Sequence, residues 1–188
     1  MKLLFLDFDG VISTFEKGNR LDIEKVQLVE EIIKQTDCKI IVSSDWAKDN
    51  KTSVDFIKET FSEKFINEHF VFVYAIIGIT NHHLGYPKRG DEIEHYLTNF
   101  KTNLESYVIL DDINDFNDNQ LFNFVQTDTY EGITSREVKL AIAILNNKKV
   151  VAPMRLNDEL KIRWYTKNNG GPDKISALLL DYHHRKFF

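Results

Sequence analysis

The chain contains little cysteine, proline or methionine. Its 188 residues include 1 cysteine, Cys38, with 3 prolines and 2 methionines. A single cysteine excludes an internal disulfide framework and a cysteine-rich zinc site. Cys38 lies between a helix-like stretch and an apolar run, which favours a buried structural thiol. Hydrophobic packing must therefore hold the fold together, and a chain of this length is able to bury a sizeable core.

Long hydrophobic runs are missing as well. No segment approaches the roughly 18 uninterrupted apolar residues of a membrane-spanning helix. The stretch MKLLFLDFDG at the N-terminus already carries an acid at position 7, so it fits a signal peptide poorly. The sequence thus predicts a cytoplasmic protein without a membrane partner, and it leaves the oligomeric state open.

The charge is mildly acidic overall but uneven along the chain. A formal net charge of -5 at pH 7 argues against a surface that coats nucleic acid. Residues 148–188, however, hold more lysine and arginine than acid, together with the adjacent aromatics Trp164 and Tyr165. Three interpretations of this tail remain open: packing of an amphipathic segment onto the body of the protein, contact with a polyanionic substrate such as an RNA end, or contact with an acidic partner.

Short apolar runs alternate with stretches of helical periodicity through residues 1–147. This alternation predicts βαβ units and an α/β fold with a doubly wound, mainly parallel, five-stranded sheet. Residues 148–188 break the pattern, and we expect them to form a basic, aromatic helical appendage to a catalytic domain at 1–147. The expected strands are 2–6, 39–42, 70–77, 107–110 and 122–126, and the expected helices are 21–36, 51–66, 91–100 and 135–146.

Three of the expected strands end in polar residues. Parallel strands bring such ends to one edge of the sheet, where ligands bind in folds of this class. Crowded carboxylates are costly without a cation, and all-oxygen ligands select a hard ion such as Mg²⁺. A single acid at a strand end is more often a turn residue, but three neighbouring strand ends with polar side chains favour a ligand-binding site. The residues concerned are Asp7, Asp9 and Gly10, then Ser43 and Ser44, then Asp111 and Asp112.

These residues resemble the motifs of HAD (haloacid dehalogenase-like) hydrolases. FLDFDGV is similar to the first motif, Ser43 to the second, Lys88 or Arg89 to the third, and VILDD to the fourth. The strings SSDW at 43–46, RGDEI at 89–93 and VQTD at 125–128 are more specifically similar to the HAD domain of Swiss-army-knife RNA repair proteins.

The resemblance implies a phosphatase mechanism. Asp7 would attack phosphorus and form an aspartyl-phosphate, and Asp9 would act as general acid and then as general base. Ser43 would bind a phosphoryl oxygen, and either Lys88 or Arg89 would neutralise the developing charge.

The same resemblance implies a metal site and a substrate surface. Mg²⁺ would be held by Asp7, the backbone carbonyl of Asp9, and the Asp111–Asp112 pair. Gly10 would allow a sharp turn beside the substrate. Ser44 and Trp46 are further candidates for substrate contact, although core packing explains Trp46 equally well.

The two segments that separate the first three motifs are too short to hold a large cap domain. Large caps of HAD enzymes are inserted after the first or the second motif, but 11–42 and 45–87 hold little beyond the elements that the core requires. We therefore expect an open site, which favours a large phosphorylated substrate such as an RNA or polynucleotide end. The alternatives are a phosphoprotein or small-metabolite phosphatase, and a HAD scaffold that only binds RNA or protein.

Overall fold

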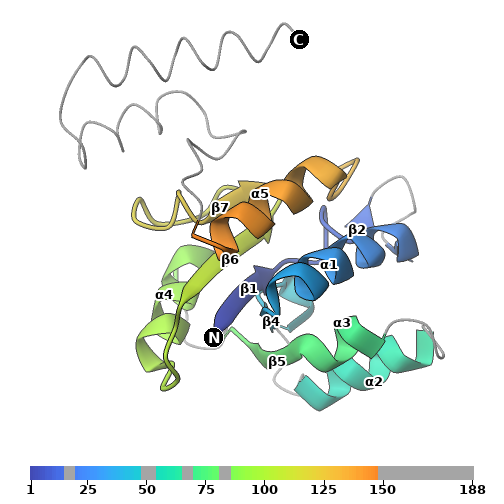
Figure 1. Ribbon diagram of the computed structural model, residues 1–188, viewed down its shortest axis with the longest axis horizontal. Coiled ribbons are helices and arrows are strands. Elements are labelled where there is room, and N and C mark those ends of the chain that lie inside the picture. The colour runs from blue at the N-terminus through green and yellow to red at the C-terminus, as the bar shows by residue number, and fades with distance from the viewer. Residues whose placement is uncertain (15–19, 48–53, 65–69, 81–85, 148–188) are drawn as a thin grey trace, which may run out of the picture. The chain divides into compact units, whose positions relative to one another are not determined.

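The computed structural model describes residues 1–14, 20–47, 54–64, 70–80 and 86–147 (Figure 1). The appendage expected at 148–188 lies outside the described residues and stays a prediction. Within the described ranges, no helix is long and apolar enough to cross a membrane.

A five-stranded sheet forms the centre of the fold, with the strand order β5-β4-β1-β6-β7. The middle strand β1 (Lys2–Leu6) pairs in parallel with β4 (Lys39–Val42) and with β6 (Ser106–Asp111). Strand β5 (Ile76–Ile79) pairs in parallel with β4, and β7 (Phe124–Gln126) pairs in parallel with β6. The predicted doubly wound α/β sheet is confirmed, with all five of its strands parallel.

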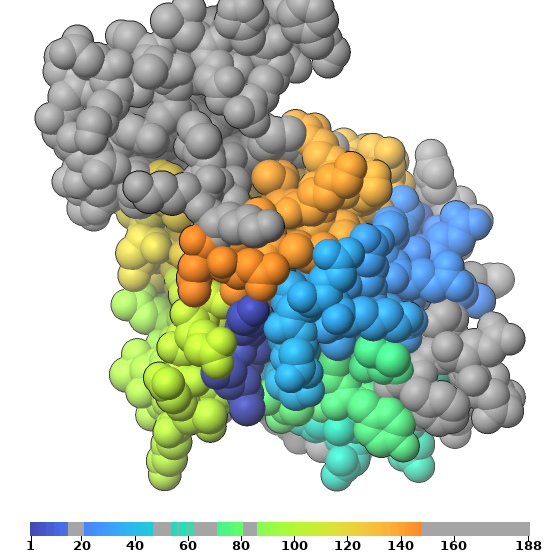
Figure 2. All heavy atoms as spheres, viewed as in Figure 1, coloured from blue at the N-terminus to red at the C-terminus, as the bar shows by residue number. Residues whose placement is uncertain are grey.

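Helices cover both faces of this sheet. Helices α1 (Ile23–Thr36) and α5 (Ser135–Leu145) lie against each other on one face (Figures 1 and 2). Leu4 and Leu6 of β1 belong to the buried cluster on that face. Because side chains alternate along a strand, Phe5 points to the other face, where it packs edge-on against Tyr96 of α4 (Arg89–Asn99).

Local signals fix the ends of the two packed helices. The Asp22 side chain accepts a hydrogen bond from the backbone N–H of Glu24 and caps the start of α1. Thr134 and Glu137 form a capping box at the start of α5. The expected helices at 21–36 and 135–146 are therefore confirmed to within two residues at each end.

Three short elements were absent from the sequence prediction. A two-stranded antiparallel ribbon, β2 (Ser13–Thr14) with β3 (Arg20–Leu21), follows the turn after β1. The 3₁₀ helix η2 (Asp45–Ala47) follows β4. Helix α2 (Val54–Lys64), which comes next, was expected, and it is shorter than the expected range 51–66.

The expectation of a strand over 70–77 was wrong in its first part. Residues Phe70–Ala75 form helix α3, and the strand β5 begins only at Ile76. The aromatic and β-branched residues of FVFVYAII favour a strand, but tertiary packing outweighs that preference. Phe72 is fully buried against Phe61 of α2, and its backbone N–H donates to the buried carboxylate of Glu30 in α1.

Candidate active site

Backbone hydrogen bonds extend the sheet into the cluster of polar strand ends. The N–H of Asp7 donates to the carbonyl of Leu110 at 3.0 Å, and the N–H of Ser43 donates to the carbonyl of Leu6 at 2.9 Å. On the other side of β6, the N–H of Thr127 donates to the carbonyl of Asp111 at 3.0 Å. The sheet itself therefore sets the backbone positions of these residues, at the point where the strand order reverses and ligands bind in such folds.

Three carboxylates meet at the ends of β1 and β6. Asp7, Asp111 and Asp112 each offer one oxygen, and these oxygens lie within 4.8 Å of one another. Burial raises the pKa of Asp7, in spite of the nearby Arg89 guanidinium and a hydrogen bond from Ser44. Burial and the neighbouring charge of Asp7 raise the pKa of Asp111 to about 8. Burial thus makes it costly for these carboxyl groups to be ionised together without a further cation.

The donor chemistry of this cluster suits a hard divalent cation. All of the available ligand atoms are carboxylate oxygens, which Mg²⁺ and Ca²⁺ prefer over softer metals. Asp111 is further held by the backbone N–H of Ile113, which donates to its Oδ1 at 2.8 Å. The predicted ligands Asp7, Asp111 and Asp112 lie together, whereas the role of the Asp9 carbonyl stays a prediction.

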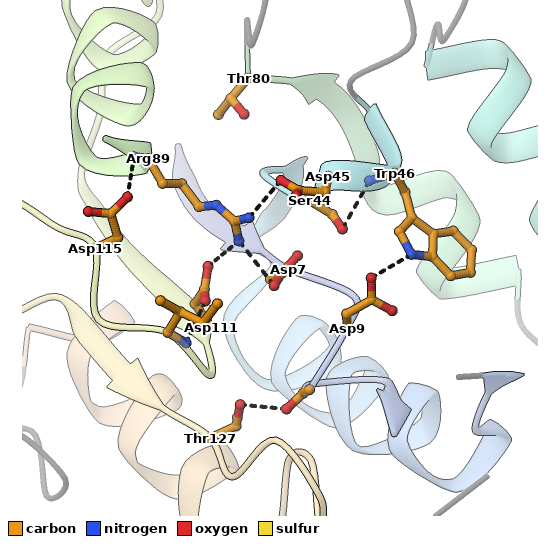
Figure 3. Close-up of polar contacts among 12 residues, drawn as sticks. Asp7, Asp9, Ser44, Asp45, Trp46, Thr80, Arg89, Asp111, Asp115 and Thr127 are labelled. Carbon is orange, nitrogen blue, oxygen red and sulfur yellow. Dashed lines mark hydrogen bonds and ion pairs between the residues drawn. The ribbon is translucent and has the colours of Figure 1, made fainter. Parts of the chain in front are cut away.

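Arg89, at the first position of α4, is the cation beside these acids (Figure 3). One guanidinium nitrogen lies 2.5 Å from Asp111 Oδ2 and 3.0 Å from Asp7 Oδ2, and the other donates to Asp45 Oδ1 at 3.0 Å. Burial alone would lower the pKa of Arg89, but the charges of Asp111 and Asp7 outweigh that effect and raise it. The guanidinium therefore stays charged at any pH of interest.

Lys88, the other candidate for this role, is exposed. It occupies the N-cap position of α4 with an extended backbone, one residue before the helix begins. Successive residues at a helix start point in different directions, and Arg89 is the one whose side chain contacts Asp7 and Asp111. The backbone N–H of Arg89 also donates to Asp115 Oδ2 at 3.1 Å, which anchors the start of the helix.

Gly10 allows the loop after β1 to pass close to Asp112. Its φ of +71° is in the left-handed region, and a Cβ at this position would lie 2.3 Å from Asp112 Cγ. Thr127 fixes the same turn, because its hydroxyl donates to the Gly10 carbonyl at 2.7 Å (Figure 3). A glycine is therefore needed both for the conformation and for the approach of the carboxylate.

The two serines after β4 differ in their surroundings. Ser44 hydrogen-bonds the Asp7 carboxylate. Ser43, the serine expected to bind phosphate, is fully buried, and its hydroxyl has no hydrogen-bond partner among the described residues. In this geometry Ser44, rather than Ser43, is the serine that contacts Asp7. Neighbours at the end of an extended strand point to opposite sides, and the sequence does not tell which side faces the site.

Asp9 and Trp46 form a pair of their own at the edge of the site. The indole Nε1–H of Trp46 donates to Asp9 Oδ2 at 2.9 Å, and Asp9 is exposed (Figure 3). The carboxylate of Asp9 is not part of the three-carboxylate cluster.

Sequence reasoning missed two contributors to the site. These are Asp45, which pairs with Arg89, and Thr127, which holds Gly10. Thr127 lies in the VQTD string that carried the resemblance, so that string was the available signal. Asp45 had a similar signal in SSDW, but its partner is far away in the sequence.

Comparison with known proteins supports the same interpretation. A family described as "HAD domain in Swiss Army Knife RNA repair proteins" matches residues 3–138, from β1 into α5. No curated protein matches the chain, and no solved structure does. The match covers the central sheet except for its first residue, Lys2, and it includes every residue of the site described above. The chain therefore belongs to the family of HAD domains found in Swiss Army Knife RNA repair proteins, within a superfamily of hydrolases.

Proposed function

We propose that the chain is a Mg²⁺-dependent phosphatase that hydrolyses a phosphomonoester through an aspartyl-phosphate on Asp7. The observation that carries this proposal is the Arg89 guanidinium, which contacts both Asp7 and Asp111 inside a cluster of three carboxylates. A fixed cation at the nucleophile is what phosphoryl transfer needs, because catalysis of this reaction rests largely on positioning and on charge stabilisation.

In the first step, an oxygen of Asp7 attacks phosphorus and the bond from phosphorus to the leaving oxygen breaks. Asp9, two residues further on, gives its proton to that leaving oxygen. In the second step, water attacks the phosphorus of the aspartyl-phosphate and gives a proton back to Asp9. Inorganic phosphate leaves, and the Asp7 carboxylate is restored. Arg89 offsets the negative charge on the phosphoryl oxygens in both steps.

The residues that would hold Mg²⁺ are Asp7, Asp111 and Asp112, with the carbonyl of Asp9 as a further candidate. The raised pKa of Asp111, caused by burial and by the neighbouring charge of Asp7, fits this assignment. Bound there, the ion would neutralise the carboxylates and polarise the phosphoryl group.

A large substrate, such as an RNA or polynucleotide end, fits the sparse surroundings of the site. The described residues between β1 and α4 belong to the core layers or to the small β2–β3 ribbon, and they include no separate cap domain. The undescribed segments in that part of the chain, 15–19, 48–53, 65–69 and 81–85, are short. A site without a cap admits a polymer end, whereas small phosphate esters are usually enclosed to exclude water.

The test compares Asp7→Asn with Asp37→Asn, the same change at an acid that is 94% exposed and outside the site. With Mg²⁺ present, Asp7→Asn should abolish hydrolysis of an aryl phosphate and Asp37→Asn should leave it unchanged. Wild-type inactivity across divalent ions and pH values contradicts the proposal. A panel of 3′-phosphorylated RNA, 5′-phosphorylated RNA, phosphopeptides and nucleotides then decides the substrate class, and a preference for peptides or nucleotides contradicts the assignment to a polynucleotide end.

A further inference from the structure

The side chains of three consecutive residues after β4 each form a hydrogen bond with a different group of the site, and Figure 3 marks two of these contacts, those of Asp45 and Trp46. Ser44 hydrogen-bonds Asp7, Asp45 pairs with Arg89 at 3.0 Å, and the indole of Trp46 donates to Asp9 at 2.9 Å. The first two contacts involve the nucleophile and its cation. The third contact involves the residue assigned to proton transfer, and the assignment of Trp46 to substrate binding does not account for it.

The indole ring is fixed from the side of the core. Trp46 packs edge-on against Phe8, with the ring centroids 5.5 Å apart. Phe8 is fully buried and makes a second edge-on contact with Phe61 of α2, at 5.3 Å. Trp46 and Asp9 therefore flank the same buried anchor, since Phe8 precedes Asp9 in the chain. A ring held in this way presents its N–H in a defined direction, whereas Asp9 is exposed between buried neighbours.

We propose that Trp46 is a positioning residue that orients the Asp9 carboxyl group for proton transfer, an inference that rests on the proposed phosphatase function. An indole N–H is a donor and never an acceptor. The oxygen that it contacts, Oδ2, therefore stays an acceptor in both protonation states of Asp9. The proton that goes to the leaving oxygen must be on Oδ1, and the indole fixes the plane in which Oδ1 lies.

The same contact keeps Asp9 apart from the metal ligands. The oxygens of Asp7, Asp111 and Asp112 already converge within 4.8 Å. A fourth carboxylate that turned into this cluster would bind the cation and would no longer be able to carry a proton. By holding Oδ2, Trp46 keeps the Asp9 side chain out of the cluster and available as an acid and base.

The substitution Trp46→Phe tests the proposal, because it keeps an aromatic ring against Phe8 and removes only the donor. Protonation matters most for basic leaving groups, so kcat/KM is measured along a series from 4-nitrophenyl phosphate to an alkyl phosphate. We expect little change for 4-nitrophenyl phosphate and a loss of roughly tenfold or more for the alkyl ester. An equal loss, or a gain, across the whole series overturns the proposal.

The same Trp46→Phe substitution is also made in an Asp9→Asn variant. If Trp46 acts through Asp9, adding Trp46→Phe to Asp9→Asn should lower kcat/KM for the alkyl ester no further. Additive losses overturn the proposal, because they mean that Trp46 contributes by another route, such as direct substrate contact.

A spectroscopic measurement separates this inference from the proposed function. The chain has 2 tryptophans, and Trp164→Phe assigns the two indole N–H signals in a nitrogen-15 spectrum. Asp9→Ala should move the Trp46 indole signal to the position of a solvent-exposed indole. An unchanged signal overturns the positioning role whether or not the enzyme is active. Inactivity of the wild-type protein on every ester overturns the proposed function instead.

Discussion

Replacing Arg89 by methionine tests whether its positive charge stabilises the buried carboxylates of the site. The side chain of Arg89 is 14% exposed, and its partners Asp7 and Asp111 are 5% and 0% exposed. Methionine fills a similar volume but, above about pH 8 where Asp111 is ionised, leaves two buried carboxylates without their cation. Removal of one partner from a buried ion pair costs about 3–5 kcal/mol, because the remaining charge stays buried. In a domain of this size, such a loss lowers Tm by roughly 6–20 °C.

Lys88→Met is the matched control, because it removes the same type of charge one residue earlier from an exposed position. Its effect on the free energy of unfolding should stay within about 0.5 kcal/mol. Thermal unfolding of both variants in chelator, and again in millimolar Mg²⁺, measures the difference. We expect Mg²⁺ to raise the Tm of Arg89→Met by more than that of the wild type, because the ion supplies the missing positive charge.

The kcat of the same two variants tests the role of Arg89 in catalysis separately from its role in stability. Even at saturating Mg²⁺, Arg89→Met should lose about 10²–10³-fold in kcat, the usual cost of removing one group that stabilises the transition-state charge. Lys88→Met should keep wild-type kcat. If the two variants are equally stable and equally active, Arg89 does not serve as the cation of the site and the electrostatic argument fails.

Three further predictions concern the carboxylates and serines. Gly10→Ala should lower Mg²⁺ affinity by roughly 10–100-fold in calorimetric titration, because the new Cβ displaces Asp112. Ser44→Ala should lower kcat/KM by roughly tenfold, whereas Ser43→Ala should leave the free energy of unfolding unchanged or raise it, because it removes an unpaired buried hydroxyl. Mg²⁺ affinity should rise with pH until about pH 8, because the raised pKa of Asp111 makes a proton compete with the ion below that value, and Asp111→Asn should flatten the profile.

The glycine prediction has a control in the same protein. Gly132 also has a positive φ, +72°, but a Cβ there would meet the Val11 carbonyl and Thr14 rather than a carboxylate. Because both glycines have a positive φ, Gly132→Ala and Gly10→Ala should each destabilise the fold, but Gly132→Ala should keep wild-type Mg²⁺ affinity. Equal losses of affinity in both variants would show that backbone strain, rather than contact with Asp112, lowers the affinity.

The pH prediction has a consequence for stability in the absence of metal. The folded Asp111 carboxyl keeps its proton up to about pH 8, whereas the unfolded carboxyl releases its proton near pH 4. Between these values the folded state binds more protons, so the free energy of unfolding falls as the pH rises. Chemical denaturation in chelator at pH 5 and at pH 8 measures this difference, and a contribution of the opposite sign contradicts it.

Much of the sheet could be predicted because its strands are short apolar runs, three of which end in polar residues. Asp7 and Asp111 stand at those ends, so parallel pairing alone brings them together. The choice between Lys88 and Arg89 could not be made in the same way, because it depends on where α4 begins to turn. The helical conformation of 70–75 was missed because burial of Phe72 between α1 and α2 is a tertiary effect that the local pattern does not show.

The place of β1 between β4 and β6 makes the site a late product of folding. Asp7 gains its neighbours Ser44, Arg89 and Asp111 only from segments far along the chain, and the pairing of parallel strands over such separations is slow. A chain cut before β6 would retain Asp7 without Asp111 and Asp112, the other two acids of the three-carboxylate cluster. On the proposed function, such a chain should neither bind a divalent ion at this cluster nor cleave a phosphate ester.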